Sequence, residues 1–101
     1  MITLKQGESF AGTVTYTPAA GDPATVENIT ILSRIRNKAG ELVDTLVITK
    51  AGDFLSFTFR DSAGTDDYPL EVLEWDFSFD FSGSVDISPT QLINVVRSSS
   101  K

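Results

Sequence analysis

The chain of 101 residues contains no cysteine and no histidine. Without cysteine there is no disulfide, no thiolate zinc site and no cysteine nucleophile, and without histidine there is no Ser-His triad and no histidine-based metal centre. The usual side chain that titrates near neutral pH is also missing. These absences exclude most hydrolytic and redox mechanisms, so we expect a protein that is not an enzyme and that needs no cofactor.

Basic residues are scarce in the second half of the chain. The net charge is -6, and residues 61–96 hold eight acids and no base. Such a surface repels a phosphate backbone, so we expect no nucleic-acid partner. The acids are explained most simply as a solvated face that keeps the protein soluble. A docking surface for a basic partner is the alternative.

Long apolar runs are absent as well. No run approaches the ~18–20 residues that span a bilayer, and the N-terminal MITLKQGESF lacks the basic start and apolar stretch of a secretory signal. We expect no membrane association, and the initial Met indicates a complete small gene product that folds in a cytoplasm. The hydrophobic fraction of 41% and the charged fraction of 22% are typical of a globular protein. We expect one domain over 1–101, with 98–101 as a frayed tail.

Apolar and polar residues alternate along most of the chain, which predicts half-buried strands. The predicted strands cover the ranges 2–6, 9–17, 29–36, 41–50, 54–60, 70–81, 84–88 and 91–97. Loops are predicted at 18–28 and 61–69, and Pro89 allows a short helical turn at 89–92. Seven to eight strands in this length predict an all-β fold, an immunoglobulin-like antiparallel β-sandwich. A small barrel is the competing architecture.

The segment EWDFSFDF (74–81) has an aromatic face and a polar face. Four exposed aromatics would form a larger apolar patch than soluble monomers usually carry. A sandwich without disulfides depends on its core, to which each buried aromatic contributes ~1.5–3 kcal/mol. We therefore expect the aromatic row to lie inside the protein rather than to form a binding surface. The row consists of Trp75, Phe77, Phe79 and Phe81.

Carboxylates invite two chemical interpretations. Aspartates of the loop and of the following strand can supply oxygen ligands for Ca²⁺; these are Asp61, Asp66, Asp67, Asp76 and Asp80. Paired outward carboxylates within 71–80 also suggest a glycosidase. The spacing does not match the helix-flanked calcium loop, and a domain this small uses its concave volume for its core. We favour solvated carboxylates in both cases, with no metal site and no catalytic residue.

Seven residues are candidates for protein docking. They are Arg34, Arg36, Glu74, Asp76, Asp80, Ile93 and Val95. The two arginines share one strand face, where pairing with an acid across the hairpin, such as Asp44, is the simpler interpretation. The three acids form the polar face of 74–81. The last two residues lie in 91–97, which has little of the charge that protects an edge strand, so we predict that this range pairs with another chain.

Three segments together resemble a known family. They are LKQGESFAGTVTY (4–16), ILSRIRNKAGELVDTL (31–46) and YPLEVLEWDFSFDFSGSVDIS (68–88). In this combination they are similar to the immunoglobulin-like N-terminal domain of bacteriophage baseplate upper proteins, and to related tail or head-attached proteins. The resemblance covers most of 2–97. The acidic loop at 61–69 departs from the family's pattern, and we expect no further domain after Arg97.

This resemblance implies a non-enzymatic structural or assembly protein of the virion, made in the host cytoplasm. Its place would be the tail, baseplate, neck or capsid, its partners other virion proteins, and its state a homo-oligomer. No cofactor or small-molecule substrate follows from the resemblance. The alternative is a ligand-binding sandwich module for a carbohydrate or a host-surface protein. That alternative needs exposed aromatics, for which Tyr68 and Phe54 are the candidates.

Overall fold

The computed structural model describes residues 1–18 and 20–98, and the end of the predicted tail, 99–101, lies outside these ranges. The strands there are β1 (Ile2–Lys5), β2 (Ala11–Thr15), β3 (Thr30–Arg36), β4 (Leu42–Thr45), β5 (Val47–Lys50), β6 (Ser56–Arg60), β7 (Val72–Phe81), β8 (Ser84–Ile87) and β9 (Gln91–Val96). No helix occurs in the described ranges, so the helical turn at 89–92 is wrong. The all-β prediction is confirmed.

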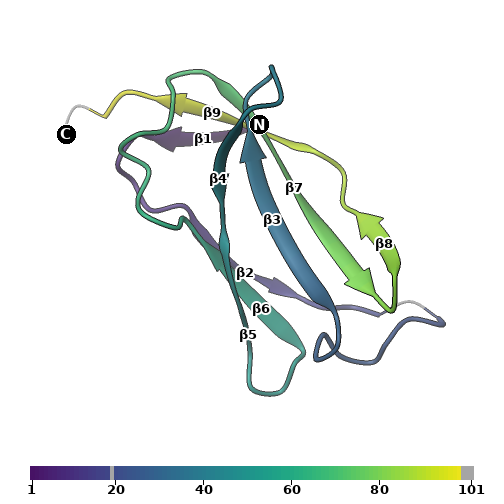
Figure 1. The fold of residues 1–101 in the computed structure, drawn as a ribbon. Helices are drawn as coiled ribbons and strands as arrows, with labels where there is room; N and C mark the ends of the chain where they lie inside the picture. The colour runs from purple at the N-terminus through teal and green to yellow at the C-terminus, as the bar shows by residue number, and fades with distance from the viewer. Residues whose placement is uncertain (19, 99–101) are drawn as a thin grey trace.

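Two sheets pack face to face (Figure 1). The larger has the order β1-β9-β7-β3-β4 with β8 also beside β7, and the smaller has the order β2-β6-β5. This arrangement confirms a β-sandwich. One pair departs from the antiparallel prediction, because β1 runs parallel to β9. The strands near the two ends of the chain lie side by side there, instead of being joined by a hairpin.

β3 and β7 form the centre of the larger sheet. They are paired without interruption from Thr30↔Asp80 to Arg36↔Glu74. On its other side β7 pairs first with β9 and then, beyond it, with β8. The residues of β7 therefore have neighbours on both sides along most of the strand. Because β9, β8 and β4 pair with β7 or β3 in fixed register, these two strands determine to which face the side chains of their neighbours project.

Aromatic rings join the two sheets. The Trp75 ring on β7 lies 4.9 Å from the Phe10 ring and 5.1 Å from the Phe59 ring on β6, measured between centroids. Phe77 lies 5.7 Å from both Phe57 and Phe59. Pairs at these separations contribute ~0.5–1.5 kcal/mol beyond their buried area. The sandwich is therefore held by interdigitated rings from β7 and β6.

The aromatic row of β7 is buried as predicted except at its end. Trp75 is 8% exposed, and Phe77 and Phe79 are partly buried against the core. Phe81 is 39% exposed, so its placement in the core is wrong. The reason is length: β7 has 10 residues, whereas β2 and β6 have 5 each, and the end of β7 extends past the smaller sheet.

The predicted strand 41–50 is two strands in different sheets. β4 pairs with β3 in the larger sheet, and β5 pairs with β6 in the smaller. The chain passes from the larger sheet to the smaller at Leu46. The Leu46 side chain is buried, and its N–H donates to the Ser33 carbonyl over 2.8 Å. Leu55, one residue before the start of β6, is 47% exposed.

Gly12 on β2 faces the Phe59 ring and supports our first prediction. A Cβ at this position would lie 2.8 Å from Phe59 Cζ, and that ring is confined by Phe10 and Trp75. Overpacking of this kind costs typically 1–3 kcal/mol. We expect Gly12→Ala to lower the free energy of unfolding in urea by about that amount. Gly52→Ala is the matched control, because its added Cβ meets nothing within 4 Å; equal losses in both variants would contradict the packing argument.

Candidate functional site

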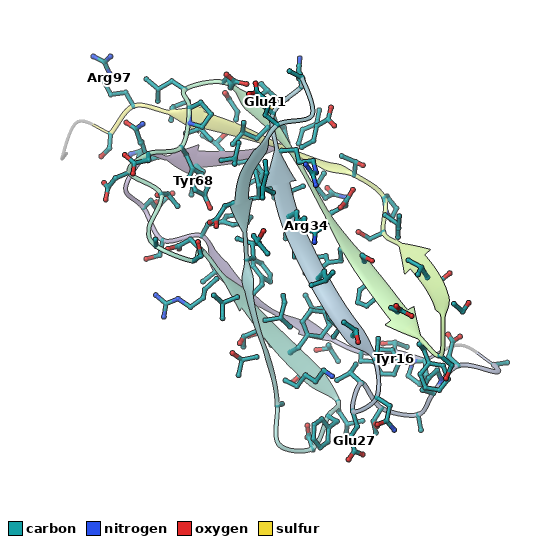
Figure 2. The ribbon with its side chains drawn as sticks, in the orientation of Figure 1. Tyr16, Glu27, Arg34, Glu41, Tyr68 and Arg97 are labelled. Carbon is teal, nitrogen blue, oxygen red and sulfur yellow. The ribbon has the colours of Figure 1, made fainter. Side chains whose placement is uncertain are left out.

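The predicted basic and acidic candidates meet on one surface of the larger sheet. Arg34 lies directly opposite Asp76, and Arg36 lies directly opposite Glu74. Residues that pair in this way project to the same face of a sheet. This face points away from β2, β5 and β6, and we call it the outer face. Figure 2 labels Arg34 on β3, in the middle of the sheet.

Alternation along β3 places the arginines outside. Ile31, Ser33 and Ile35 are buried, while the residues between them are exposed. The buried Ser33 hydroxyl accepts a hydrogen bond from Trp75 Nε1 over 2.7 Å and donates one to the Asp76 carbonyl over 3.0 Å. These inner bonds fix the register of β3 against β7, and that register sets Arg34 beside Asp76 on the other side.

The charges on the outer face nearly balance. Arg34 and Arg36 stand against Glu74 and Asp76, and Asp80 lies opposite the uncharged Thr30. These five charged side chains sum to -1, whereas the chain carries -6. Opposite charges paired across strands contribute roughly 0.2–1 kcal/mol each. The three predicted acids therefore do not form an isolated acidic stripe, because two of them adjoin an arginine.

Exposed apolar side chains flank these charges. Leu42 on β4 lies opposite Arg36, and Leu92 on β9 lies opposite Glu74. Further along, Ser78 of β7 pairs with Leu32 on one side and with Ile87, which is 67% exposed, on the other. A shallow groove of about 240 Å³ crosses this region; it is lined by Leu32, Arg34, Arg36, Glu74, Asp76, Ser78 and Ile87.

The sequence analysis missed the apolar part of the outer face, although a signal for it exists. Ser82 and Gly83 both have positive φ, 52° and 84°, as in a two-residue hairpin turn. Such a turn makes Phe81 pair with Ser84. Since the aromatic row of β7 faces inward, the side chain of Ile87, three positions after Ser84, must then face outward.

Two predicted docking residues are not on the surface. Ile93 is 0% exposed and Val95 is 2% exposed, and both belong to the core. β9 lies between β1 and β7, so it is not an edge strand and the prediction of edge pairing there is wrong. The sequence shows low charge in this segment, but it does not show that β1 covers it.

Asp44 is also not the partner of Arg34 that we expected. Thr45 lies opposite Arg34, and Asp44 lies opposite the buried Ile35 and is itself buried. Its carboxylate accepts hydrogen bonds from the Tyr68 hydroxyl, from the Ser62 hydroxyl at 2.5 Å and from the Ser62 N–H at 3.2 Å. Asp44 therefore ties the acidic loop to β4.

The acidic loop folds over one end of the sandwich. Asp61 is buried, and it accepts hydrogen bonds from the N–H groups of Phe10 at 2.9 Å and Gly64 at 2.8 Å. Our expectation of a solvated carboxylate is wrong there, whereas Asp66 and Asp67 are exposed. Tyr68 is buried as well, so it cannot serve as an exposed aromatic for a ligand.

The described residues offer neither a metal site nor a membrane-spanning helix. Within 1–18 and 20–98, no three potential metal-ligating side chains come close enough together to hold an ion. The aspartates considered for Ca²⁺ are divided between the buried loop anchor Asp61, the exposed loop and the outer face of β7. The same ranges contain no helix with the length and hydropathy that crossing a membrane requires.

A cavity of about 410 Å³ opens at the other end of the sandwich, beside the turn between β7 and β8. Its walls include the rings of Tyr16, Phe79 and Phe81 and the carboxylates of Asp22 and Asp86. The Tyr16 hydroxyl donates to the Pro23 carbonyl over 2.6 Å, which ties the loop to the end of β2. Figure 2 shows Tyr16 near this turn. Aromatic walls with a few polar groups are the usual make-up of a ligand pocket.

Tyr68 gives a prediction about stability and pH. Burial, with the hydrogen bond to Asp44 and the charges of Asp44 and Asp61, raises the pKa of Tyr68 well above its ordinary 10.0. Above pH 10 the unfolded chain releases a proton that the folded chain keeps, so the free energy of unfolding falls as pH rises. Tyr68→Phe removes one donor to a buried carboxylate and should cost about 1–3 kcal/mol at neutral pH. Its stability should also decline less steeply above pH 10; an unchanged slope would contradict this assignment.

Comparison of the chain with protein-family models, with curated proteins and with solved structures finds no match. The fold is an all-β sandwich of a six-stranded sheet and a three-stranded sheet. The outer face and the cavity beside Tyr16 are its two candidate functional sites.

Proposed function

We propose that this chain is a non-enzymatic structural protein of a bacteriophage particle, with an immunoglobulin-like sandwich that docks through its outer face on virion proteins, among them further copies of itself. The phage assignment rests on the resemblance of the segments 4–16, 31–46 and 68–88. The docking assignment rests on one observation: Arg34 and Arg36 lie beside Asp76 and Glu74 on a sheet face flanked by exposed apolar side chains.

The composition of the outer face supports protein docking. Arginine is enriched at protein interfaces, and exposed apolar side chains that gather in one place mark interaction sites. Leu32 and Ile87 stand on either side of Ser78, next to the paired charges. Exposed apolar side chains on one face of the sheet, beside charges that nearly balance, are suited to a partner that covers the sheet.

The edge formed by β8 supports the same proposal. Among the described residues β8 pairs with β7 alone, so its other side has unpaired backbone groups. Val85 and Ile87 of this strand are both exposed. Natural proteins either protect such an edge or use it for pairing. A partner on the outer face would reach this edge as well.

Incorporation into particles tests the proposal. A phage that lacks this gene is complemented with the wild-type chain, with Ile87→Lys or with the control Leu55→Lys. Leu55 is also exposed, but it lies just before β6 of the smaller sheet. We expect mass spectrometry of purified particles to find the wild type and Leu55→Lys in equal amounts, and Ile87→Lys reduced about tenfold or more, which corresponds to ~1.4 kcal/mol of docking energy.

Two results would contradict the proposal. Absence of the wild-type chain from purified particles would reject the structural role in the virion. Equal incorporation of Ile87→Lys and Leu55→Lys would reject the outer face as the docking surface. Thermal unfolding of both variants, followed by circular dichroism, must first show that each folds as the wild type does.

The cavity beside Tyr16 favours a second candidate function, a carbohydrate-binding module. Sugar rings stack on aromatic side chains such as Phe81, and their hydroxyls bond to carboxylates such as Asp86, both of which line this cavity. NMR titration with a panel of monosaccharides and oligosaccharides should shift the amides of residues around this cavity, and Phe81→Ala should abolish the shifts. Spectra that stay unchanged across the panel would reject this candidate.

A further inference from the structure

We infer that the outer face binds a second copy of this chain, around a two-fold axis that runs parallel to β3 and β7 and between them. This inference rests on the proposed function and names the partner of the outer face. It is carried by the order of side chains across four strands. That order makes the face complementary to itself, which a symmetric dimer requires because both copies use the same surface.

One row of side chains crosses the sheet at right angles to the strands. It consists of Leu42 on β4, Arg36 on β3, Glu74 on β7 and Leu92 on β9, each in register with the next. The order is apolar, basic, acidic, apolar. Reversing this row exchanges the basic and acidic positions and keeps an apolar residue at each end, so the row complements its own reverse.

The two-fold axis performs this reversal. It brings β3 of the second copy over β7 of the first, and β4 of the second over β9 of the first. Arg36 of the second copy then faces Glu74, and Leu92 of the second copy faces Leu42. Sheets that pack face to face lie about 10 Å apart, so side chains from both can interdigitate.

The next charged row obeys the same symmetry. Arg34 and Asp76 repeat the basic and acidic pair two residues along the strands, at ~6.5–7 Å by strand rise. In the next row Leu32 lies opposite Ser78, and Ser78 lies opposite Ile87. The axis places Ser78 of the second copy over Leu32 of the first, and Ile87 of the second copy one strand further out. Leu32 and Ile87 therefore lie next to the charged rows in this contact.

Charge arguments favour a second copy over other occupants. A two-fold axis across the strands would set β3 over β3 and bring arginine against arginine, which is unfavourable. A strongly charged partner would gain little, because the five charged residues of β3 and β7 on the outer face sum to -1. Two chains of -6 repel each other at long range, but this face is where their charges balance.

Arg36 has hydrogen-bonding capacity left for the partner. Its Nη1 donates to the Gly40 carbonyl over 3.1 Å, within the hairpin that joins β3 and β4. A guanidinium has five N–H donors, so a single such bond leaves others for a carboxylate of the second copy. The hairpin bond also restrains the side chain, which reduces the entropy lost on docking.

Charge reversal in two complementary variants tests the inference. The first, Arg34→Glu with Arg36→Glu, leaves only acids among the charged residues of β3 and β7 on this face, and the second, Glu74→Arg with Asp76→Arg, gives these strands four arginines beside Asp80. Sedimentation should find the wild type dimeric and each variant alone monomeric. An equimolar mixture should restore a one-to-one dimer, and added salt should weaken it. Restoration in the mixture also shows that both variants are folded.

Several outcomes would overturn the inference. They are a wild type that stays monomeric at about 1 mM, where even weak dimers form; variants that keep the wild-type mass; and folded variants whose mixture remains monomeric. If a variant fails to fold, the single change Leu92→Lys takes its place, and it must weaken the dimer at least about tenfold. A monomeric wild type together with selective loss of Ile87→Lys from particles would leave the proposed function standing with a different virion protein as partner.

Discussion

The contact between the rings of β7 and those of β6 is the interaction on which the rest of this structure depends. With no cysteine to cross-link the sheets, Trp75 and Phe77 from the larger sheet and Phe57 and Phe59 from the smaller sheet hold the sandwich together. Ring packing turns one face of β7 inward, and the alternation of a strand then turns the other face outward. The position of every candidate docking residue on β7 follows from that contact.

Buried hydrogen bonds set the strand register and the position of the acidic loop, which ring packing alone does not determine. Ser33 links β3 to β7 from the inner side, while Asp44 and Asp61 attach the acidic loop to the end of the sandwich. A buried polar group without a partner is costly, and every buried side-chain nitrogen or oxygen of the described residues has one. The register that sets Arg34 against Asp76 is thus fixed by bonds on the opposite face. In our proposal the core determines the docking surface.

The sequence predicts much of this fold, and the failures have physical causes. Alternation correctly predicts which side chains of β7 face the core. It does not show how far the smaller sheet extends, which is why the prediction of a buried side chain fails at Phe81. The alternation also predicts a single strand at 41–50. The chain changes sheets at Leu46, but apolar and polar residues continue to alternate on both sides of that residue. Five of the seven docking candidates lie on the outer face; Ile93 and Val95 do not, since strand order depends on contacts distant in sequence. The apolar flank was predictable from the Ser82-Gly83 turn.

If the outer face is complementary to itself, Leu42 of one copy faces Leu92 of the other. The absence of cysteine from the chain allows this contact to be measured directly by cross-linking. Single cysteines are introduced as Leu42→Cys in one preparation and Leu92→Cys in another. The preparations are mixed and treated with a bismaleimide that spans about 10 Å, the separation of packed sheets. For a dimer of this kind we expect efficient links between position 42 of one copy and position 92 of the other, and few links between identical positions. Absence of 42-to-92 links, or links between identical positions at equal yield, would contradict it.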